Sequence, residues 1–268
     1  MKRYCLYHID IDGIMSAAIV NLFVRDVTFI PMNYGYEVPW DILKGNEVYL
    51  VDFSIDDMER LDQECCLTWI DHHQKTGDFR GIHRIGTAGC ELTWEWFSKD
   101  PMPRAVQLAG RWDVWDHKDP DCEPFQYGVR QLPPDPTHAC WKHLLKGIGL
   151  DETVFRGKII VNAMNALNEA SVAGYGFMTE LEGLRVAALN TERFGSKLFS
   201  SVWDPERMDA VMVYRWCPKA GCYSASIYTE KPDIDVGAIA KKYGGGGHKG
   251  AAGFRFTEHP FKETTDAI

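Results

Sequence analysis

The stretch RYCLYHIDIDGIMSAAIVNLF (residues 3–23) joins a β-rich apolar run to an amphipathic one. Its first part predicts a strand, and its second part carries apolar side chains at helical spacing. Between them, the segment HIDIDG supplies His8, Asp10 and Asp12. If this segment stays extended, its alternation places all three side chains on one face. The alternative is a turn, which Asp and Gly commonly form.

The same order of strand and helix continues along the first half of the chain. Short apolar runs lie at residues 27–32, 47–53 and 66–70, and a helical pattern lies at residues 55–63. Strands separated by helices are typical of βαβ units and a parallel sheet. We therefore expect an α/β fold that begins with a parallel-sheet domain flanked by helices.

The second half changes character after a polar, Pro-rich stretch at residues 116–138, which reads as a connector or an irregular insertion. Helical patterns follow around residues 140–146 and 152–173, and a β-rich region begins near residue 183. The runs MDAVMVYRW and CYSASIYT flank a turn-like CPKAG and predict a hairpin. The expected domains are residues 1–120, a connector with helices at 121–181, and a smaller α/β domain at 182–268.

Composition limits the class of function. The formal charge of -9 and the pI near 5.5 argue against a protein that coats long nucleic acid through a basic surface. No apolar run has the length of a membrane span or of a signal-peptide core, so a cytoplasmic location is expected. The eight cysteines include no CxxC pair and predict buried thiols rather than a zinc site or a disulfide framework.

Metal-capable side chains follow three of the predicted strands. Besides HIDIDG, Asp52 follows one strand, and Asp71, His72 and His73 follow another. Loops after parallel strands converge at one edge of the sheet. Carboxylates gathered there repel one another unless cations neutralise them. Mixed oxygen and imidazole ligands favour Mn²⁺, Fe²⁺, Co²⁺ or Zn²⁺. As alternatives, Asp52 could precede a helix as a cap, and the two His could be ordinary loop residues.

These residues resemble a known family. HIDIDG, VDFS, IDHH and the later Asp in GRWDVWDH resemble motifs I to IV of the DHH phosphoesterases. GGGGHKGAAGF resembles the glycine-rich signature of the DHHA1 domain that follows in one branch of that family. The resemblance covers residues 2–117 and 182–256, and the pairing of domains resembles the oligoribonuclease (nanoRNase) branch.

The resemblance implies a two-metal phosphodiesterase that is usually Mn²⁺-dependent. Two divalent ions can activate a water molecule and stabilise both reacting oxygens of a phosphodiester. One ion is expected at His8, Asp10 and Asp52, and the other at Asp12, Asp52, His72 and Asp113. His73 would lie beside the phosphate. Asp71 would orient a metal ligand without binding the ion itself. Asp116 is the alternative to Asp113, and Trp112 and Trp115 either stack on a base or pack in the core.

The glycine-rich segment predicts a substrate-binding loop. A helical pattern ends at residue 243, and Gly244 can end the helix in a left-handed conformation. The backbone amides of Gly245, Gly246 and Gly247 are then expected to form a nest that binds a substrate phosphate. The side chains of His248 and Lys249 are expected to add hydrogen-bond donors and positive charge. A flexible linker is the alternative. Where many DHHA1 domains carry a phosphate-contacting Arg, this sequence has Tyr228, and Lys231, Lys241 or Arg215 are the candidates to compensate.

The resulting hypothesis is two-metal hydrolysis of very short RNA, about two to five nucleotides, to mononucleotides. The alternatives are linear or cyclic dinucleotides or 3′-phosphoadenosine 5′-phosphate within the same chemistry and, in a different class, a non-catalytic nucleotide-binding regulator. The expected partner is a short RNA or small nucleotide, with neither long duplex nor membrane. A homodimer is left open.

Overall fold

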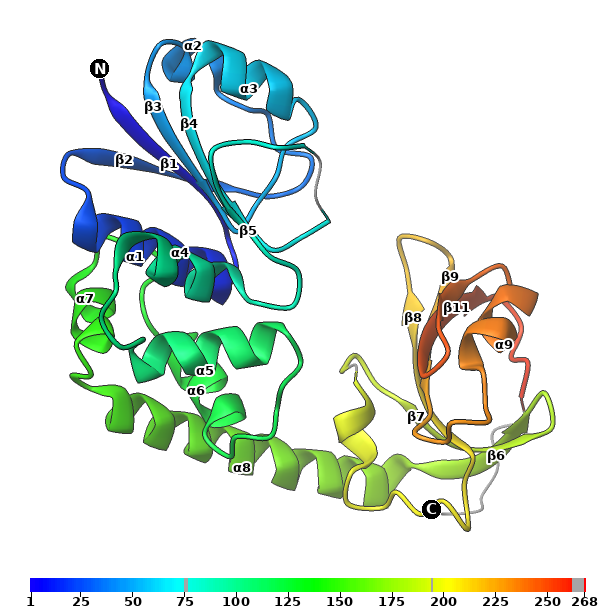
Figure 1. Ribbon diagram of the computed structural model, residues 1–268. Coiled ribbons are helices and arrows are strands. Elements are labelled where there is room, and N and C mark those ends of the chain that lie inside the picture. The colour runs from blue at the N-terminus through cyan, green and yellow to red at the C-terminus, as the bar shows by residue number, and fades with distance from the viewer. Residues whose placement is uncertain (75–76, 194, 262–267) are drawn as a thin grey trace. The chain divides into compact units, whose positions relative to one another are not determined.

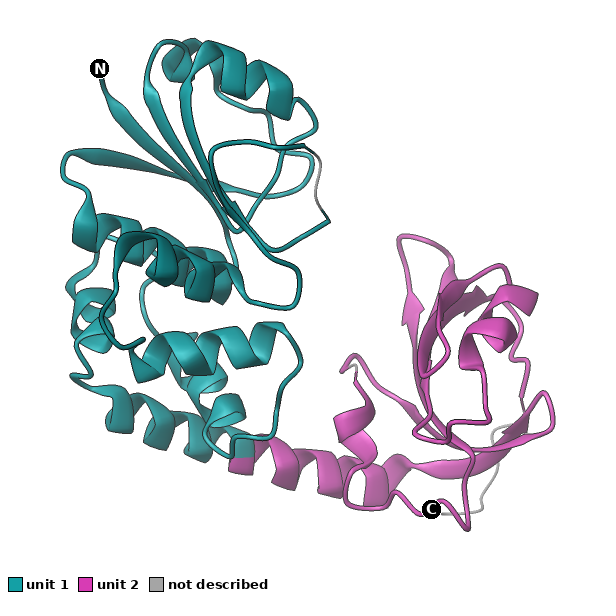
Figure 2. Ribbon diagram, in the orientation of Figure 1, with its two compact units in different colours: residues 1–161 teal, residues 162–268 magenta. Residues whose placement is uncertain are grey.

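The computed structural model describes residues 1–74, 77–193, 195–261 and 268. The chain forms two compact units, Met1–Val161 and Asn162–Ile268 (Figure 2). Helix α8 (Leu150–Tyr175) runs across this division. The division into residues 1–120, 121–181 and 182–268 stays a prediction. Within the described part of the chain, no helix is both long enough and apolar enough to cross a membrane.

The first unit is built on a five-stranded parallel sheet in the order β2-β1-β3-β4-β5 (Figure 1). Both faces of the sheet are covered, because alternate side chains of β1 enter two different apolar cores. Parallel strands covered on both faces need nearly continuous apolar runs. The strands are β1 (Arg3–His8), β2 (Val27–Met32), β3 (Glu47–Val51), β4 (Cys66–Asp71) and β5 (Gly81–His83).

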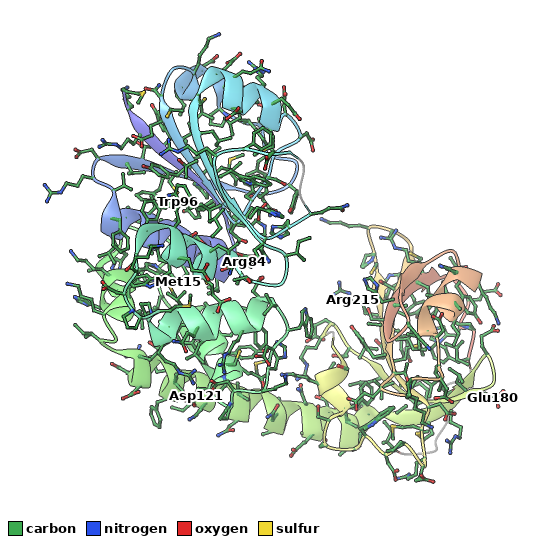
Figure 3. All side chains as sticks on the ribbon, viewed as in Figure 1. Met15, Arg84, Trp96, Asp121, Glu180 and Arg215 are labelled. Atoms are coloured by element: carbon green, nitrogen blue, oxygen red, sulfur yellow. The ribbon has the colours of Figure 1, made fainter. Side chains whose placement is uncertain are left out.

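Helices cover the two faces unequally. The short helices α2 (Trp40–Leu43) and α3 (Met58–Glu64) pack on the face lined by Tyr4 and Leu6. The larger core on the other face contains the fully buried Met15, which is labelled in Figure 3. Its helices are α1 (Ile11–Phe23), α4 (Gly89–Phe97), α5 (Arg104–Asp113), α6 (Cys122–Val129) and α7 (Ala139–Leu145). This unit has the parallel-sheet architecture that the sequence predicted.

The backbone stays extended as far as Asp10, and α1 begins at Ile11, so the condition for three alternating side chains on one strand face is not met. Asp10 is the N-cap of α1, and its Oδ1 accepts a hydrogen bond from the Gly13 amide at 2.9 Å. Asp is among the preferred N-cap residues because its carboxylate satisfies a free amide of the first turn. Asp12 consequently lies in that first turn. A Cβ at Gly13 would be 2.1 Å from the His8 carbonyl oxygen, so glycine allows the turn to pack directly against the strand end.

The Pro-rich stretch is more regular than predicted, because it contains α6. Pro124 lies in the first turn of this helix, where a missing amide proton leaves no intrahelical bond unmade. Phe125 and Val129 are fully buried in the larger core. Apolar residues in this stretch therefore anchor the helix despite its polar composition.

The second unit has a mixed six-stranded sheet in the order β10-β11-β9-β8-β7-β6. Only β7 and β8 pair in parallel among its described strands. The predicted hairpin is confirmed, since β8 and β9 pair from Val211 with Tyr228 to Cys217 with Cys222. The strands are β6 (Phe177–Leu181), β7 (Leu184–Asn190), β8 (Ala210–Cys217), β9 (Cys222–Tyr228), β10 (Gly246–His248) and β11 (Ala251–Phe256); η1 (Ser196–Phe199) is a 3₁₀ turn.

The glycine-rich segment follows α9 (Val236–Lys242). Gly244 has φ +73° and ends the helix as predicted, with the Gly245 amide donating to the Ala240 carbonyl at 2.9 Å. The next residues differ from the predicted nest, because Gly246–His248 form the edge strand β10 paired with β11. A nest needs alternating helical conformations rather than a strand.

Candidate metal centre

The carboxyl ends of the parallel strands bring together side chains that are far apart in sequence. His8 ends β1, Asp52 directly follows β3, and Asp71 ends β4. His72 follows Asp71, and Asp113 is the last residue of α5. Parallel strands present their carboxyl ends at one edge, and the structure gathers these groups there.

One group of potential ligands consists of His8, Asp10 and Asp52, whose ligand atoms all lie within 4.8 Å of one another. The His8 Nδ1 is 2.8 Å from an Asp10 carboxylate oxygen and 3.9 Å from Asp52 Oδ2. Asp10 is in reach because it caps α1 immediately after the strand. A single ion could therefore be held by one imidazole and two carboxylates.

A second group surrounds His72. Its Nε2 lies 3.2 Å from Asp52 Oδ1, 3.3 Å from Asp113 Oδ2 and 3.8 Å from Asp12 Oδ2. Asp52 thus directs one carboxylate oxygen toward each group, which is the arrangement a bridging ligand requires. Asp116 belongs to neither group among the described residues, and its Oδ1 lies 3.7 Å from Lys118 Nζ.

Several polar atoms at this edge are buried without a hydrogen-bond partner in the described part of the chain. They include His8 Nδ1, His72 Nε2 and both carboxylate oxygens of Asp52. His8 Nδ1 and His72 Nε2 instead have carboxylate oxygens at 2.8 and 3.2 Å. Buried polar atoms are nearly always satisfied, so each exception needs an explanation. Lone pairs converging on a shared cation explain this set, and its oxygen and imidazole donors suit a transition-metal ion such as Mn²⁺.

The electrostatics of the cluster point the same way. Burial, reinforced by the Asp12 and Asp10 carboxylates, raises the pKa of Asp52 well above its usual range. The same causes raise the pKa of Asp113 to about 7. Burial lowers the pKa of His72, although Asp12 acts in the opposite direction. Without cations the site therefore disfavours its own charges, and divalent ions would reverse this preference.

The backbone at Asp52 is held in an unusual conformation. Its φ of +53° lies in the left-handed region, which non-glycine residues seldom adopt. The Asp52 amide donates to the Ile70 carbonyl at 2.8 Å, which ties this turn to β4. Gly89 packs against the side chain, since a Cβ there would be 2.7 Å from both Asp52 Cβ and Oδ1. Backbone strain maintained by neighbours is typical of functional sites.

Helix α4 supports Asp12 through contacts that sequence analysis did not predict. The amides of Gly89 and Cys90 each donate to the Asp12 carboxylate at 2.7 Å. The first amides of a helix have no intrahelical acceptor and favour a negative charge. Asp12 is 3% exposed, so α4 fixes an otherwise buried carboxylate.

Asp71 is buried and holds the His73 ring in place. The Asp71 Oδ1 accepts from the His72 amide at 2.8 Å and lies 2.7 Å from His73 Nδ1. This hydrogen bond raises the pKa of His73. The His73 carbonyl also lies 2.5 Å from His83 Nε2. The outer nitrogen of a fixed, more readily protonated ring is suited to donate to a phosphate.

A fourth strand end, which sequence analysis overlooked, also contributes. Tyr34 follows β2, and its ring lies 5.9 Å from that of His8 and 5.1 Å from that of Phe53. Burial, together with Asp71 and Asp52, raises the pKa of its hydroxyl. Tyr34 is neither a carboxylate nor an imidazole, so a search for those groups could not select it.

The two tryptophans of the fourth motif have different surroundings. Trp112 packs against the larger core and stacks on His117 at 4.6 Å. Trp115 is 83% exposed, with its ring 5.0 Å from His117. Packing accounts for Trp112, whereas base stacking by Trp115 stays a prediction.

The predicted substrate-binding residues lie in the second unit. Gly246, Gly247, His248 and Lys249 are exposed, and Gly245 is half-buried. Among the candidates to compensate for Tyr228, Lys231 is engaged elsewhere, because its Nζ lies 2.6 Å from Asp209. Arg215 donates to the Glu192 carbonyl at 3.2 Å, and Lys241 is exposed. Their roles toward substrate stay predictions.

Comparison with known proteins supports the fold. No protein-family model matches the chain. Uncharacterized protein R106 of Acanthamoeba polyphaga mimivirus is 26% identical over 246 residues, which are 81% of this chain and 55% of that protein. The chain thus spans about half the length of this curated relative.

Two solved structures extend the comparison. The pGpG-specific phosphodiesterase PggH from Vibrio cholerae has a TM-score of 0.58 at 12% identity, covering 95% of this chain and 93% of that one. An exopolyphosphatase-related protein from Bacteroides fragilis has a TM-score of 0.48 at 14% identity, covering 96% and 88%. The likeness to PggH shows that this chain shares its fold over nearly the whole length of both chains.

Proposed function

We propose that this protein is a two-metal phosphodiesterase that hydrolyses very short oligoribonucleotides to mononucleotides. The observation that supports it best is the convergence of buried, unpartnered imidazole and carboxylate atoms on two neighbouring points that share Asp52. A purely structural cluster would satisfy these atoms with one another. Divalent ions, when bound, would supply charge neutralisation and activation of water.

The side chains divide the work around that centre. His8 and Asp10 would hold one ion and Asp12, His72 and Asp113 the other, with Asp52 shared. His73, fixed by Asp71, would donate a hydrogen bond to a non-bridging phosphate oxygen and so favour the more highly charged transition state. In the second unit, His248 and Lys249 would supply donors for a substrate phosphate.

A dedicated dinucleotide phosphodiesterase is the second candidate. It is favoured by the likeness to PggH, which is a pGpG-specific phosphodiesterase. The metal chemistry would be the same, and the difference would lie in how many nucleotides the protein accepts. A nucleotide-binding regulator without catalysis has less support, because it has little need for six potential ligands around a shared carboxylate.

The test is product analysis with Mn²⁺ and end-labelled RNAs that range from a dinucleotide to long oligomers, beside a cyclic dinucleotide and 3′-phosphoadenosine 5′-phosphate. Release of mononucleotides that declines steeply with length supports the short-RNA activity. Cleavage confined to the dinucleotide lanes supports the second candidate. Absence of cleavage in every lane, with metal binding demonstrated, would contradict both.

A further inference from the structure

A cavity of about 270 Å³ adjoins the metal centre within the first unit. One of its lining residues is Asp10, which also belongs to the first group of potential ligands. Pockets for drug-sized ligands span about 300–1,000 Å³, so this smaller one suits a single nucleotide rather than a dinucleotide. It is therefore a candidate site beside the reacting phosphate.

The cavity lining combines apolar walls with one cation. Ile9, Leu132 and Pro134 contribute apolar surface, and Arg130 contributes a guanidinium; the buried Ile14 and Trp141 lie behind them. Flat apolar walls suit a nucleobase, whereas a guanidinium donates in a planar fork that matches phosphate oxygens.

The walls are firmly held. Trp141 is 1% exposed, and its indole nitrogen donates to the Pro133 carbonyl at 2.9 Å. The Leu132 amide donates to the Val129 carbonyl at 3.0 Å, which continues the end of α6 into the wall. The Pro-rich segment is thus a shaped surface rather than a loose connector, and such a preformed cavity lowers the ordering cost of binding.

Arg130 is available for an anion. The described residues provide it with no carboxylate within ion-pair distance; its guanidinium lies 5.8 Å from the Tyr127 ring centroid instead. The Gln126 side-chain oxygen accepts a hydrogen bond from the Arg130 guanidinium at 3.2 Å when its amide is oriented to satisfy both the oxygen and the nitrogen. Neutral neighbours hold the side chain while leaving its charge uncompensated.

We propose that this cavity binds the nucleoside monophosphate portion of the substrate, with the base between the apolar walls and a phosphate oxygen on Arg130. This inference rests on the proposed function, because it places the nucleotide next to Asp10 and the cation that Asp10 would hold. Asp10 and Arg130 both line this cavity. The site binds one nucleotide, which suits a protein whose products are mononucleotides.

The test is calorimetric binding of adenosine 5′-monophosphate, adenosine and inorganic phosphate to the full-length, Mn²⁺-saturated protein. Arg130→Gln should weaken binding of the monophosphate by about tenfold or more, the scale of a lost charged hydrogen bond. The same variant should leave adenosine binding unchanged. Arg130→Lys, which keeps the charge but loses the planar fork, should be intermediate. Leu132→Trp, which fills the cavity, should weaken both nucleoside ligands.

Arg25→Gln is the matched control, because Arg25 is exposed in the same unit and does not line the cavity. The inference is overturned if the wild type does not bind the monophosphate, or if Arg130→Gln binds it as tightly as Arg25→Gln does. RNA cleavage measured in parallel separates the two proposals. Cleavage without an Arg130 effect on binding would sink the cavity assignment alone. Arg130-dependent binding without cleavage of any substrate would sink the proposed activity alone.

Discussion

Asp52 in the first unit and Asp209 in the second have opposite surroundings. Asp209 lies 2.9 Å from an Arg185 guanidinium nitrogen and 2.6 Å from Lys231 Nζ. The Arg185 hydrogen bonds, helped by Lys231, hold its pKa far below the usual range. Asp52 is 1% exposed, and neither of its oxygens has a hydrogen-bond partner among the described residues. Its pKa is raised by burial and by neighbouring carboxylates.

Asp209 is thus a carboxylate whose ion pairs stabilise the fold, whereas Asp52 is a carboxylate suited to bind a cation. Removing a partner from a buried ion leaves an uncompensated charge, which is strongly destabilising. The second unit avoids this by supplying two cations from its own chain. The first unit instead surrounds Asp52 with further carboxylates, so its ionised form would be favoured by cations from outside the chain.

The largest effect is expected from Asp52→Asn. Asn tolerates the left-handed backbone at this position and keeps the size of the side chain. Phosphodiester cleavage should fall by about 10²–10³-fold, the scale of losing one group that stabilises transition-state charge. Without metal, the variant should unfold at the same temperature as the wild type or higher, because a repelled carboxylate is gone. Thermal unfolding in EDTA and initial rates in Mn²⁺ check both; marked destabilisation of the metal-free variant would refute the contrast with Asp209.

A smaller effect is expected from Asp71→Asn. This side chain contacts His73, which would lie beside the phosphate under the proposed function. Cleavage should fall by about 10–100-fold, as is usual for groups that orient the residues of a metal site. Retained Mn²⁺ content, measured by elemental analysis, should accompany the loss. Wild-type rates would show that the orientation of His73 is immaterial.

Gly89→Ala tests the packing around Asp52. The added methyl would lie 2.7 Å from the Asp52 side chain, so it should displace this ligand and weaken Mn²⁺ binding by about tenfold. Gly174→Ala is the matched control, because a Cβ at Gly174 meets nothing within 4 Å. Equal Mn²⁺ affinities of the two variants would show that packing of Gly89 against Asp52 does not affect metal binding.

Asp209→Asn should affect stability alone. Loss of its charged hydrogen bonds should lower the free energy of unfolding of the second unit by about 1–3 kcal/mol, with Mn²⁺ content unchanged. The native pKa of Asp209 is depressed, so its contribution is present above the unfolded pKa of about 3.9 and is lost as pH falls. Urea unfolding of variant and wild type should therefore converge progressively below about pH 5. A difference that grows in acid would contradict the assignment.

Most of the side chains that converge at the site could be predicted from the sequence, but the contacts that hold them in place could not. The convergence of these side chains could be predicted because parallel strands end at one edge, and HIDIDG, VDFS and IDHH mark three of those ends. The contact of Asp12 with α4 could not, because its partners lie 77 and 78 residues away and donate through backbone amides. A backbone amide has no signature in a sequence.

Local conformation was harder to predict than convergence. The alternation in HIDIDG fits a strand, yet capping by Asp10 and the close approach allowed by Gly13 start the helix there. Similarly, polar and Pro residues at 116–138 concealed α6, whose Phe125 and Val129 find their partners only in the folded core. Tertiary packing decided both cases.

The most direct test of the central claim is the number of Mn²⁺ ions bound per chain, measured by calorimetric titration of metal-free protein with elemental analysis afterwards. Two ions are predicted for the wild type and for Asp209→Asn, and the Asp52→Asn variant should lose tight binding of both, because Asp52 has one oxygen near His8 and the other near His72. If Asp52→Asn binds two ions as tightly as the wild type, or if the wild type binds none, the unpartnered cluster is not a two-metal centre.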